Sequence, residues 1–362
     1  MHKVLRWVIR GLLGGIAILV VLLVGALAYS GLSQRMTLAS TRIDTERGIE
    51  SLEKVVLGGL EQTIYLRGHD QKNPLLLFLH GGPGLPSMPQ AREFGLRLEE
   101  HFVVVHWDQR GAGSSCDQKI PNESLNREQY LADTLELVNL LRHRFRVEKI
   151  HLLGHSWGSV LGAITAQRHP ELLHTYIGMG QVVNIDRGEQ ISYRFVVEAA
   201  KAEGNQNALR ELETIQPPYA NTKEVMIQRS WLGYYRGDSL SGDAIERSAR
   251  AVFLSPEYDI STKLSFYGCA INSLDHTWDN LQDIDFFLDI PRLDVPVYFF
   301  MGRHDYNTPF SLVERYFEIL EAPYKEIVWF EESAHMPNLE EPERFQDAII
   351  EKISTQPSAA SL

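Results

Sequence analysis

The chain has 362 residues, of which 44% are hydrophobic and 23% charged, and it carries a formal net charge of −12. This length favours one large core with a sizeable insertion, and the composition is that of a globular protein. Because nucleic-acid binding needs clustered Lys and Arg to neutralise phosphates, the acidic balance argues against a nucleic-acid partner.

The N-terminus differs from the rest of the chain. A short basic segment over residues 1–10 precedes an uncharged, mostly apolar stretch over residues 11–34. As a helix, Gly11 to Tyr29 would span about 28 Å at roughly 1.5 Å per residue, close to the thickness of a bilayer's hydrocarbon core. We therefore predict a single transmembrane anchor over residues 11–34, followed by a connector over residues 35–49.

The orientation of this anchor follows from its charges. Positive residues before the span predict a cytoplasmic N-terminus, with the body of the chain on the extracytoplasmic side of the membrane. The alternative is a signal peptide, because Ala26-Leu27-Ala28 resembles a cleavage site and cleavage would release a secreted protein. We favour the anchor, since the apolar stretch is longer than the 7 to 15 residues or so of a signal peptide.

After the connector, short apolar runs alternate with amphipathic stretches. This pattern predicts the α/β class, with a mostly parallel sheet wrapped by helices. The runs that we interpret as buried strands are Leu75–Leu79, Phe102–Val105, Ile150–Leu153, Tyr176–Met179, Val297–Phe300 and Ile327–Phe330. The strand pattern disappears over residues 186–289, which we predict to be a helical cap inserted between two parts of one core, residues 50–185 and 290–355.

The strongest local signal is Gly154-His155-Ser156-Trp157-Gly158, which follows an apolar run and opens a helical pattern. A G-x-S-x-G sequence in this setting is typical of a sharp strand-to-helix turn that exposes a nucleophilic serine. The two glycines are needed because strand and helix nearly collide there. The alternative is an ordinary glycine-rich turn. We predict that Ser156 is a nucleophile and that the neighbouring His155 serves packing.

A serine nucleophile needs a general base and a carboxylate that orients the base. In this architecture they follow the serine in the order acid, then histidine, on loops after later strands. Asp305 and His335 each come directly after a predicted strand and fit that order. Alternatively, Asp305 caps the helix that begins near Pro309, and His335 follows a strand by chance. We predict Asp305 and His335 as catalytic residues.

A second glycine cluster, His80-Gly81-Gly82-Pro83-Gly84, follows the first of these strands. A glycine loop beside the nucleophile lets backbone N–H groups approach a developing oxyanion. We assign the oxyanion hole to the amides of Gly82 and Trp157 and expect His80 to brace the loop. A tight turn that uses glycine and proline for its geometry is compatible with this role.

Cys116 and Cys269 are the only cysteines, and no Cys/His cluster suits zinc, so we predict no metal site. The two could pair in an oxidising compartment, but the sequence cannot supply the separation that a disulfide requires. We treat both as free thiols.

These motifs together resemble the proline iminopeptidase branch of the α/β-hydrolase superfamily. The resemblance extends from about Leu52 to Phe345 and rests on the glycine loop at His80, the segment Trp107–Ser114, the serine pentapeptide with Ser159, and Gly302–Asp305. It implies an eight-stranded sheet, a Ser-His-Asp triad, no cofactor, and a small-molecule or short-peptide substrate bound under a cap. It also implies that the segment Trp107–Ser114 is a structural loop beside the site.

The resemblance is weakest in the cap. Proline iminopeptidases hold the substrate's α-amino group with cap acids, one of them after a tryptophan-rich helix, but Ser230–Arg236 contains no acid. Glu246, Glu257 or another cap acid could replace them. The cap aromatics could line an apolar pocket or belong to the core; these are Trp231, Tyr234, Tyr235, Phe266, Tyr267 and Trp278.

We therefore expect an aminopeptidase of the proline iminopeptidase type. The alternatives within the same chemistry are a carboxylesterase, lactonase or amidase. An alternative of another class is a ligand-binding protein that keeps the fold without turnover. The sequence leaves the oligomeric state open.

Overall fold

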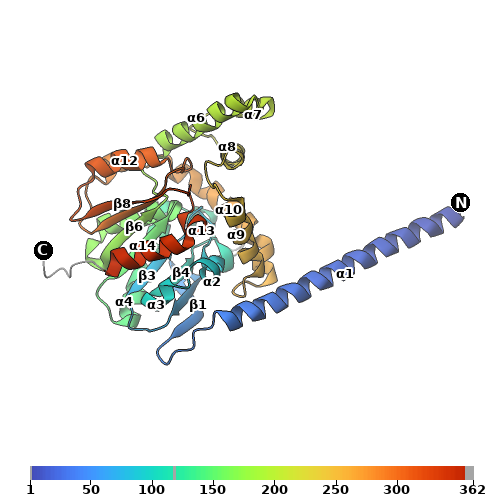
Figure 1. Cartoon of the computed structure of the whole chain (residues 1–362), viewed down its shortest axis with the longest axis horizontal. Helices are drawn as coiled ribbons and strands as arrows, with labels where there is room; N and C mark the ends of the chain where they lie inside the picture. The colour runs from blue at the N-terminus through green and yellow to red at the C-terminus, as the bar shows by residue number, and fades with distance from the viewer. Residues whose placement is uncertain (1, 117–119, 355–362) are drawn as a thin grey trace.

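A computed structural model, which describes residues 2–116 and 120–354, has an eight-stranded sheet at its centre (Figure 1). The strands lie in the order β1-β2-β4-β3-β5-β6-β7-β8. Their bounds are β1 (Ile49–Leu57), β2 (Leu60–Gly68), β3 (Leu75–Leu79), β4 (Val103–Asp108), β5 (Ile150–His155), β6 (Leu173–Met179), β7 (Val297–Gly302) and β8 (Lys325–Phe330). The pairs β1–β2 and β2–β4 are antiparallel and all others are parallel, which confirms the predicted α/β class with a mostly parallel sheet.

The six predicted apolar runs coincide with strands, except that Phe102 comes one residue before β4. No apolar run was predicted for the hairpin β1–β2. The side chains of β1 alternate between exposed and half-buried positions along most of its length. Because this strand lies at the edge of the sheet, it is not buried on both faces and does not need a continuous apolar sequence.

Helices cover both faces of the sheet. Because successive side chains of a strand point to opposite faces, the strands contribute to two separate hydrophobic clusters. On β3, Leu75, Leu77 and Leu79 belong to the larger hydrophobic cluster, whereas Leu76 and Phe78 belong to the other. The larger cluster includes residues of α4 (Arg127–Phe145), α5 (Trp157–Arg168) and α12 (Phe310–Ile319). The other includes residues of α3 (Leu98–His101) and α14 (Pro342–Ser354). Two short helices, α2 (Ala91–Phe94) and α13 (Pro337–Glu340), complete the core.

The helices between β6 and β7 match the stretch predicted as a cap. They are α6 (Ile185–Glu203), α7 (Gln206–Leu212), α8 (Thr222–Tyr234), α9 (Gly242–Leu254), α10 (Ile260–Thr277) and α11 (Phe286–Asp289). Each begins at an Asn, Ser or Asp whose side chain accepts a hydrogen bond from an amide of the first turn. Figure 1 shows α6 to α10 grouped on one side of the molecule.

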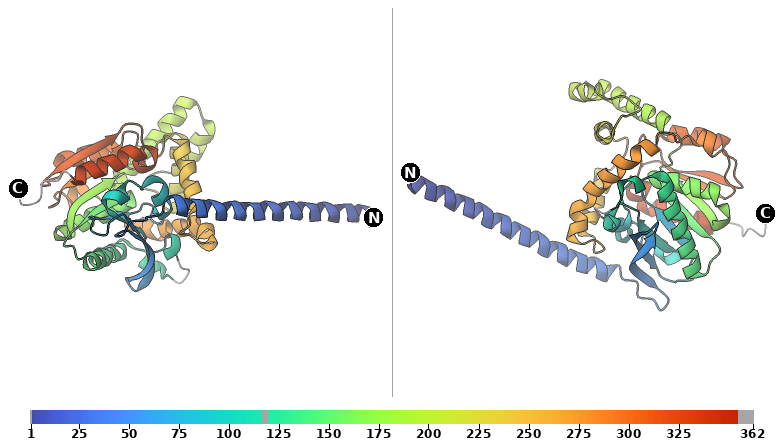
Figure 2. Two further views of the ribbon diagram at one scale, coloured as in Figure 1. Left: turned by 60° about the horizontal axis from the view of Figure 1, so that its bottom comes forward. Right: turned by 180° about the vertical axis from the view of Figure 1, so that it is seen from behind.

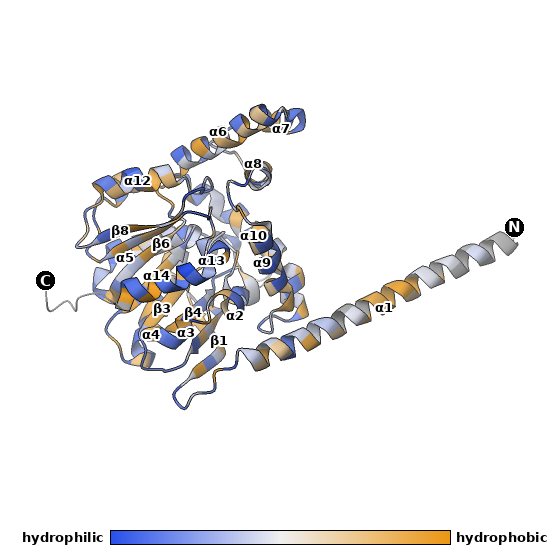
Figure 3. Ribbon diagram, viewed as in Figure 1, coloured by the Kyte–Doolittle hydropathy of each residue, from blue (hydrophilic) through white to orange (hydrophobic). Residues whose placement is uncertain are grey.

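Helix α1 (His2–Ser40) extends away from the body, as both views of Figure 2 show. Its middle carries apolar residues (Figure 3), and its last turns occupy the first part of the predicted connector. Within the part of the chain that the structure describes, no helix meets the combined length and hydropathy needed to cross a membrane.

Candidate active site

Ser156 occupies a sharp turn between β5 and α5. Its backbone has φ 53° and ψ −118°, a strained conformation for a residue with a side chain. A Cβ added to Gly154 would lie 2.2 Å from the carbonyl oxygen of Gly158, and one on Gly158 would lie 2.1 Å from that of Leu79. Both positions therefore require glycine, Gly154 because of the predicted crowding between strand and helix at the turn, and Gly158 because the neighbouring strand β3 lies against the start of α5.

Asp305 and His335 lie together on the loops after β7 and β8. The Nδ1 atom of His335 is 2.9 Å from Oδ2 of Asp305, and both side chains are buried. Because a carboxylate only accepts hydrogen bonds, this contact assigns the proton of the neutral imidazole to Nδ1 and leaves Nε2 as an acceptor.

Asp305 also organises the turn before α12. Its Oδ1 atom accepts hydrogen bonds from the amides of Asn307 and Thr308, at 2.9 and 2.8 Å, and its Oδ2 accepts one from the Thr308 hydroxyl at 2.8 Å. The capping role and the contact with His335 are therefore compatible, because the carboxylate has enough lone pairs for both.

The end of β6 brings His335 toward the serine. The amide of Ser156 donates to the carbonyl of Met179 at 2.9 Å. The next residue, Gly180, has φ +52°, and a Cβ there would lie 2.8 Å from the imidazole of His335. The turn after β6 therefore contacts both the nucleophile's backbone and the base's ring.

His155 packs against His335. Their ring centroids are 4.8 Å apart, and Nε2 of His155 is 3.0 Å from the carbonyl oxygen of His335. Burial lowers the pKa of His155 to about 3, so its ring is neutral at physiological pH. These contacts give His155 the packing role expected from its position beside the serine.

The glycine loop after β3 lies against Ser156. A Cβ on Gly81 would be 3.2 Å from the Cβ of Ser156, and the next residue, Gly82, has φ +115°. Trp157 is the first residue of α5, where amides have no partner within the helix. The loop and the helix start thus flank the serine, while the assignment of the Gly82 and Trp157 amides as oxyanion donors stays a prediction.

Gln109 connects the glycine loop after β3 to the start of α5, a role that the sequence did not reveal. Its backbone amide donates to Nε2 of His80, its side-chain amide donates to the carbonyl of His80, and its side-chain oxygen accepts from the indole of Trp157, each at 3.1 Å. Burial lowers the pKa of His80 to about 4, which keeps its ring neutral and able to accept. The only signal in the sequence was the position of Gln109 in the segment Trp107–Ser114.

Replacing Gln109 with leucine should lower stability by about 1–3 kcal/mol for each buried polar group left unpaired, and kcat by about tenfold or more, because the two segments that flank Ser156 lose their link. The measurement is kcat for an aryl ester, with the melting temperature recorded in parallel. Gln167→Leu, at an exposed position at the end of α5, is the matched control. A lowered melting temperature with unchanged kcat would contradict a role in positioning the two segments.

Glu340 connects the cap to the loop that carries His335. Its Oε1 atom accepts from the amides of Leu240 and Ser241, at 2.6 and 3.1 Å, and from the Ser239 hydroxyl at 3.0 Å. Its Oε2 atom accepts from the amide of Ala334 at 2.8 Å. The carboxylate therefore fixes the loop between α8 and α9 against the residue that precedes His335.

The same cap loop contacts both predicted catalytic loops through its backbone. The amide of His335 donates to the carbonyl of Asp238 at 3.0 Å, and the amide of Tyr306 donates to that of Gly237 at 2.8 Å. The segment from Gly237 to Ser241 thus covers the loops that carry Asp305 and His335.

Asp238 has a carboxylate oxygen without a partner. Its Oδ1 atom is buried and makes no hydrogen bond within the described part of the chain. Burial raises the pKa of Asp238, whereas the charge of His335 and hydrogen bonds from the backbone at Asp238 and Ser239 act to lower it, and the charge of Asp305 acts to raise it. Asp238 is therefore close to the pair formed by His335 and Asp305.

The two cap acids named from the sequence are differently placed. Glu246 is exposed on α9. Glu257 accepts from Nε of Arg92 at 2.6 Å and from the Ser255 hydroxyl at 2.7 Å. Glu257 is thus part of a buried ion pair, and of the cap acids discussed here only Asp238 has an unpaired buried oxygen.

The six cap aromatics do not gather around one pocket. Phe266 and Trp278 are buried in two different hydrophobic clusters. Trp231, Tyr234 and Tyr235 contact one another at the end of α8, and Tyr267 is exposed. Core packing or mutual contact accounts for most of them.

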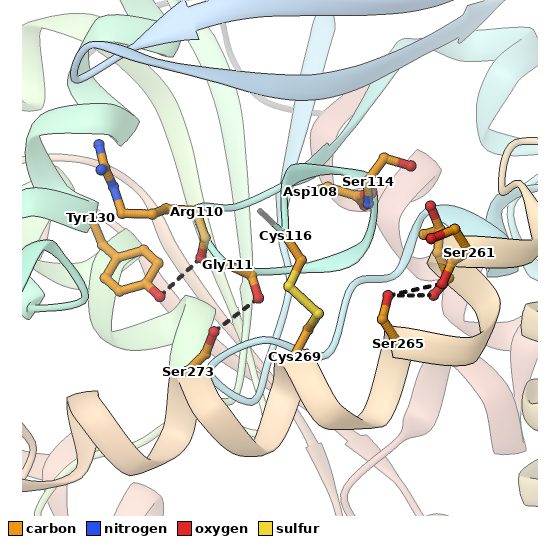
Figure 4. The surroundings of a disulfide bond; sticks show 11 residues. Asp108, Arg110, Gly111, Ser114, Cys116, Tyr130, Ser261, Ser265, Cys269 and Ser273 are labelled. Atoms are coloured by element: carbon orange, nitrogen blue, oxygen red, sulfur yellow. Dashed lines mark hydrogen bonds between the residues drawn. A yellow bond between two sulfur atoms is a disulfide. The ribbon is translucent and has the colours of Figure 1, made fainter. Parts of the chain in front are cut away.

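The treatment of the cysteines as free thiols is wrong. Cys116 and Cys269 form a disulfide, with their Cα atoms 6.2 Å apart, within the usual range for such bonds (Figure 4). The bond joins the loop after β4 to α10, beside a hydrogen bond of 2.9 Å from the Ser273 hydroxyl to the carbonyl of Gly111. The sequence separation of 153 hides this proximity in the sequence.

In the described residues, no group of three or more His, Cys, Asp and Glu side chains is arranged to hold a metal ion.

Known proteins resemble the chain in both sequence and fold. Residues 74–206 match the alpha/beta hydrolase fold family. The probable aminopeptidase YbaC of Bacillus subtilis is 34% identical over 313 residues, which cover 85% of this chain and 97% of that protein.

Two solved structures illustrate the similarity of fold. The proline iminopeptidase-related protein of Thermus thermophilus has a TM-score of 0.59 at 22% identity, over 84% of this chain and 98% of that one. A 2-hydroxy-6-oxo-6-phenylhexa-2,4-dienoate hydrolase from Rhodococcus has a TM-score of 0.56 at 19% identity, over 84% and 100%. At these identities the likeness concerns the fold alone.

Proposed function

Because the chain belongs to the α/β-hydrolase family and is a serine hydrolase similar to proline iminopeptidases, we propose that Ser156, His335 and Asp305 form its catalytic triad. The observation that carries the proposal is the contact of 2.9 Å between His335 and Asp305, on loops that meet the turn beside Ser156. The strained backbone of Ser156 and the glycine loop against it support the same assignment.

The proposed reaction proceeds through an acyl-enzyme. Nε2 of His335 takes the proton of the Ser156 hydroxyl as its oxygen attacks the substrate carbonyl, and Asp305 stabilises the resulting imidazolium. The amides of Gly82 and Trp157 donate to the oxyanion. His335 then gives its proton to the leaving amine, which breaks the scissile bond. A water molecule, deprotonated by His335, attacks the ester carbonyl and releases the acid, and the proton returns to Ser156.

For the substrate, we propose a short peptide from which the N-terminal residue is removed. The naming of the YbaC relative as a probable aminopeptidase supports this choice. So does the unpaired carboxylate oxygen of Asp238 beside His335, because an ammonium group bound in a buried site needs a carboxylate partner. We therefore assign the recognition of the substrate's α-amino group to Asp238.

Replacing Asp238 with asparagine should raise KM for an aminoacyl arylamide by roughly 10- to 100-fold, since hydrogen bonds to charged groups contribute about 1.5–3 kcal/mol. The KM for an aryl ester of similar size should change little. Glu246→Gln, at an exposed position of the same cap, is the matched control. Equal changes for both substrates would show that Asp238 serves only to hold the cap loop.

The pH dependence provides a second readout for Asp238. Only the ionised carboxylate attracts an ammonium group, and burial raises its pKa above the usual value. As the pH falls through this raised pKa, the KM for the arylamide should rise relative to the KM for the ester. The ratio of the two KM values cancels pH effects that both substrates share, and it should become independent of pH in Asp238→Asn.

We also propose that residues 11–34 anchor the chain in a membrane, with the active site on the extracytoplasmic side. Support comes from the uncharged sequence of this stretch, from the basic residues before it, and from its exposed apolar side chains between Leu13 and Leu32. The disulfide supports the orientation, because such bonds persist in oxidising compartments.

In cells that express the full chain, the protein should stay in the membrane pellet after alkaline extraction. Protease added outside the cytoplasmic membrane should digest the catalytic domain. A soluble protein that begins just after Ala28, identified by N-terminal sequencing, would instead establish the secreted alternative.

A further inference from the structure

Helix α10 carries a row of apolar side chains that face away from the core. Ile260, Leu264, Tyr267 and Ile271 recur at the spacing of one helix face and are between 50% and 79% exposed. We call these four residues the outer stripe. The opposite face of α10 is already buried, through Phe266, Cys269, Ala270, Ser273 and Thr277. The helix therefore has a second apolar face for which the described chain offers no cover.

The outer stripe begins beside helix α1. Gln34 of α1 donates to the carbonyl of Ser255, in the turn between α9 and α10, at 3.3 Å. Ile260 follows five residues later as the first residue of α10. Phe253, in the last turn of α9, adds another exposed apolar ring next to this turn. Both views of Figure 2 show one end of the α9–α10 pair beside α1 where that helix leaves the body.

The contact between Gln34 and Ser255 lies near the end of the apolar stretch of α1. Exposed apolar side chains recur densely on α1 from Leu13 to Leu32, with Met36 and Leu38 further on, and the uncharged stretch ends at Gln34, directly before Arg35. Two residues of α-helix span only about 3 Å, so Gln34 lies next to the end of the apolar stretch. If that stretch lies in hydrocarbon, the turn at Ser255 is at the level of the bilayer surface.

We propose that the outer stripe and Phe253 rest on the bilayer surface, so that the cap is docked on the membrane that holds the anchor. This inference rests on the membrane anchor proposed above. The bilayer is the occupant that the structure favours, because the stripe adjoins the apolar part of α1. Apolar side chains with aromatic members are also what a membrane interface accepts. The full-length chain would thus contact the membrane through two separate surfaces.

The test uses the full chain in vesicles of phosphatidylcholine and phosphatidylglycerol that contain doxyl-labelled lipid. Since the disulfide occupies both native cysteines, an introduced cysteine offers a single thiol for an environment-sensitive fluorophore. The test variant is Leu264→Cys in the outer stripe. Leu288→Cys on α11 is the matched control, because Leu288 is 76% exposed and Leu264 is 79% exposed. Leu19→Cys in α1 reports on the anchor.

We expect lipid labelled near its headgroup to quench the fluorophore at position 264 but not at position 288, and deeply labelled lipid to quench it at position 19. Quenching at 19 without quenching at 264 would overturn the docking and leave the anchor intact. No quenching at 19 would overturn the anchor and the docking together. Disulfide-linked dimers of Leu264→Cys without lipid quenching would show that a second copy covers the stripe, which also overturns the proposal.

Discussion

Replacing Ser156 with alanine is expected to lower kcat by about 10⁴- to 10⁶-fold for arylamide and ester substrates alike, because the acyl-enzyme can no longer form. The loss should appear in kcat rather than in KM, since alanine leaves the space around the substrate nearly unchanged. The fold should survive, because the elbow depends on Gly154 and Gly158 and not on the serine hydroxyl.

Ser159→Ala separates the nucleophile from the hydroxyl that supports it. The Ser159 hydroxyl donates to the carbonyl of Ser156 at 2.6 Å and accepts from the amide of Val182 at 3.0 Å. Its loss should lower stability and affect kcat far less than the loss of the Ser156 hydroxyl. A kcat of Ser156→Ala within about 100-fold of the native value would contradict the acyl-enzyme mechanism.

Removing the disulfide, by Cys116→Ser with Cys269→Ser, is expected to cost about 2–5 kcal/mol of stability. The bond closes a loop with a sequence separation of 153 residues, and in the chain-entropy account a long loop gains the most from being closed. Because the bond joins the cap helix α10 to the core loop after β4, activity should fall at lower denaturant concentrations than the loss of secondary structure.

Urea unfolding of the full chain in detergent, with and without reductant, measures this effect. The native protein should become less stable on reduction, whereas the double variant should not respond to reductant. Ser265→Ala, on the same helix, removes only hydrogen bonds to the preceding turn and serves as the control. Equal urea midpoints for oxidised and reduced native protein would show that the bond does not form in solution.

Features that depend on residues close together in the chain could be predicted from the sequence. The serine turn could be predicted because the crowding at Gly154 arises within a single pentapeptide, whereas the contact of Gly158 with Leu79 of β3 is visible only in the fold. The buried strands could be predicted because a sheet covered on both faces needs continuous apolar runs. The hairpin β1–β2 had no such run, since β1 at the sheet edge shows alternating burial.

Contacts between distant segments could not be predicted. Three of these contacts join residues that are far apart in sequence. They are the disulfide, the hydrogen bonds of Gln109 to His80 and Trp157, and the hydrogen bonds of Glu340 to the cap loop. Asp238 is a similar case. It lies just beyond the segment where an acid was expected, but only the folded loop shows its unpaired oxygen near His335.

The most direct test of the catalytic assignment is labelling of the full chain with a fluorophosphonate, followed by peptide mass spectrometry. The probe phosphonylates a serine only where a base and an oxyanion hole activate it. We predict a single modified serine, Ser156, with no labelling in Ser156→Ala and strongly reduced labelling in His335→Ala. Modification of another serine, or an unmodified Ser156 in folded protein, would contradict the account.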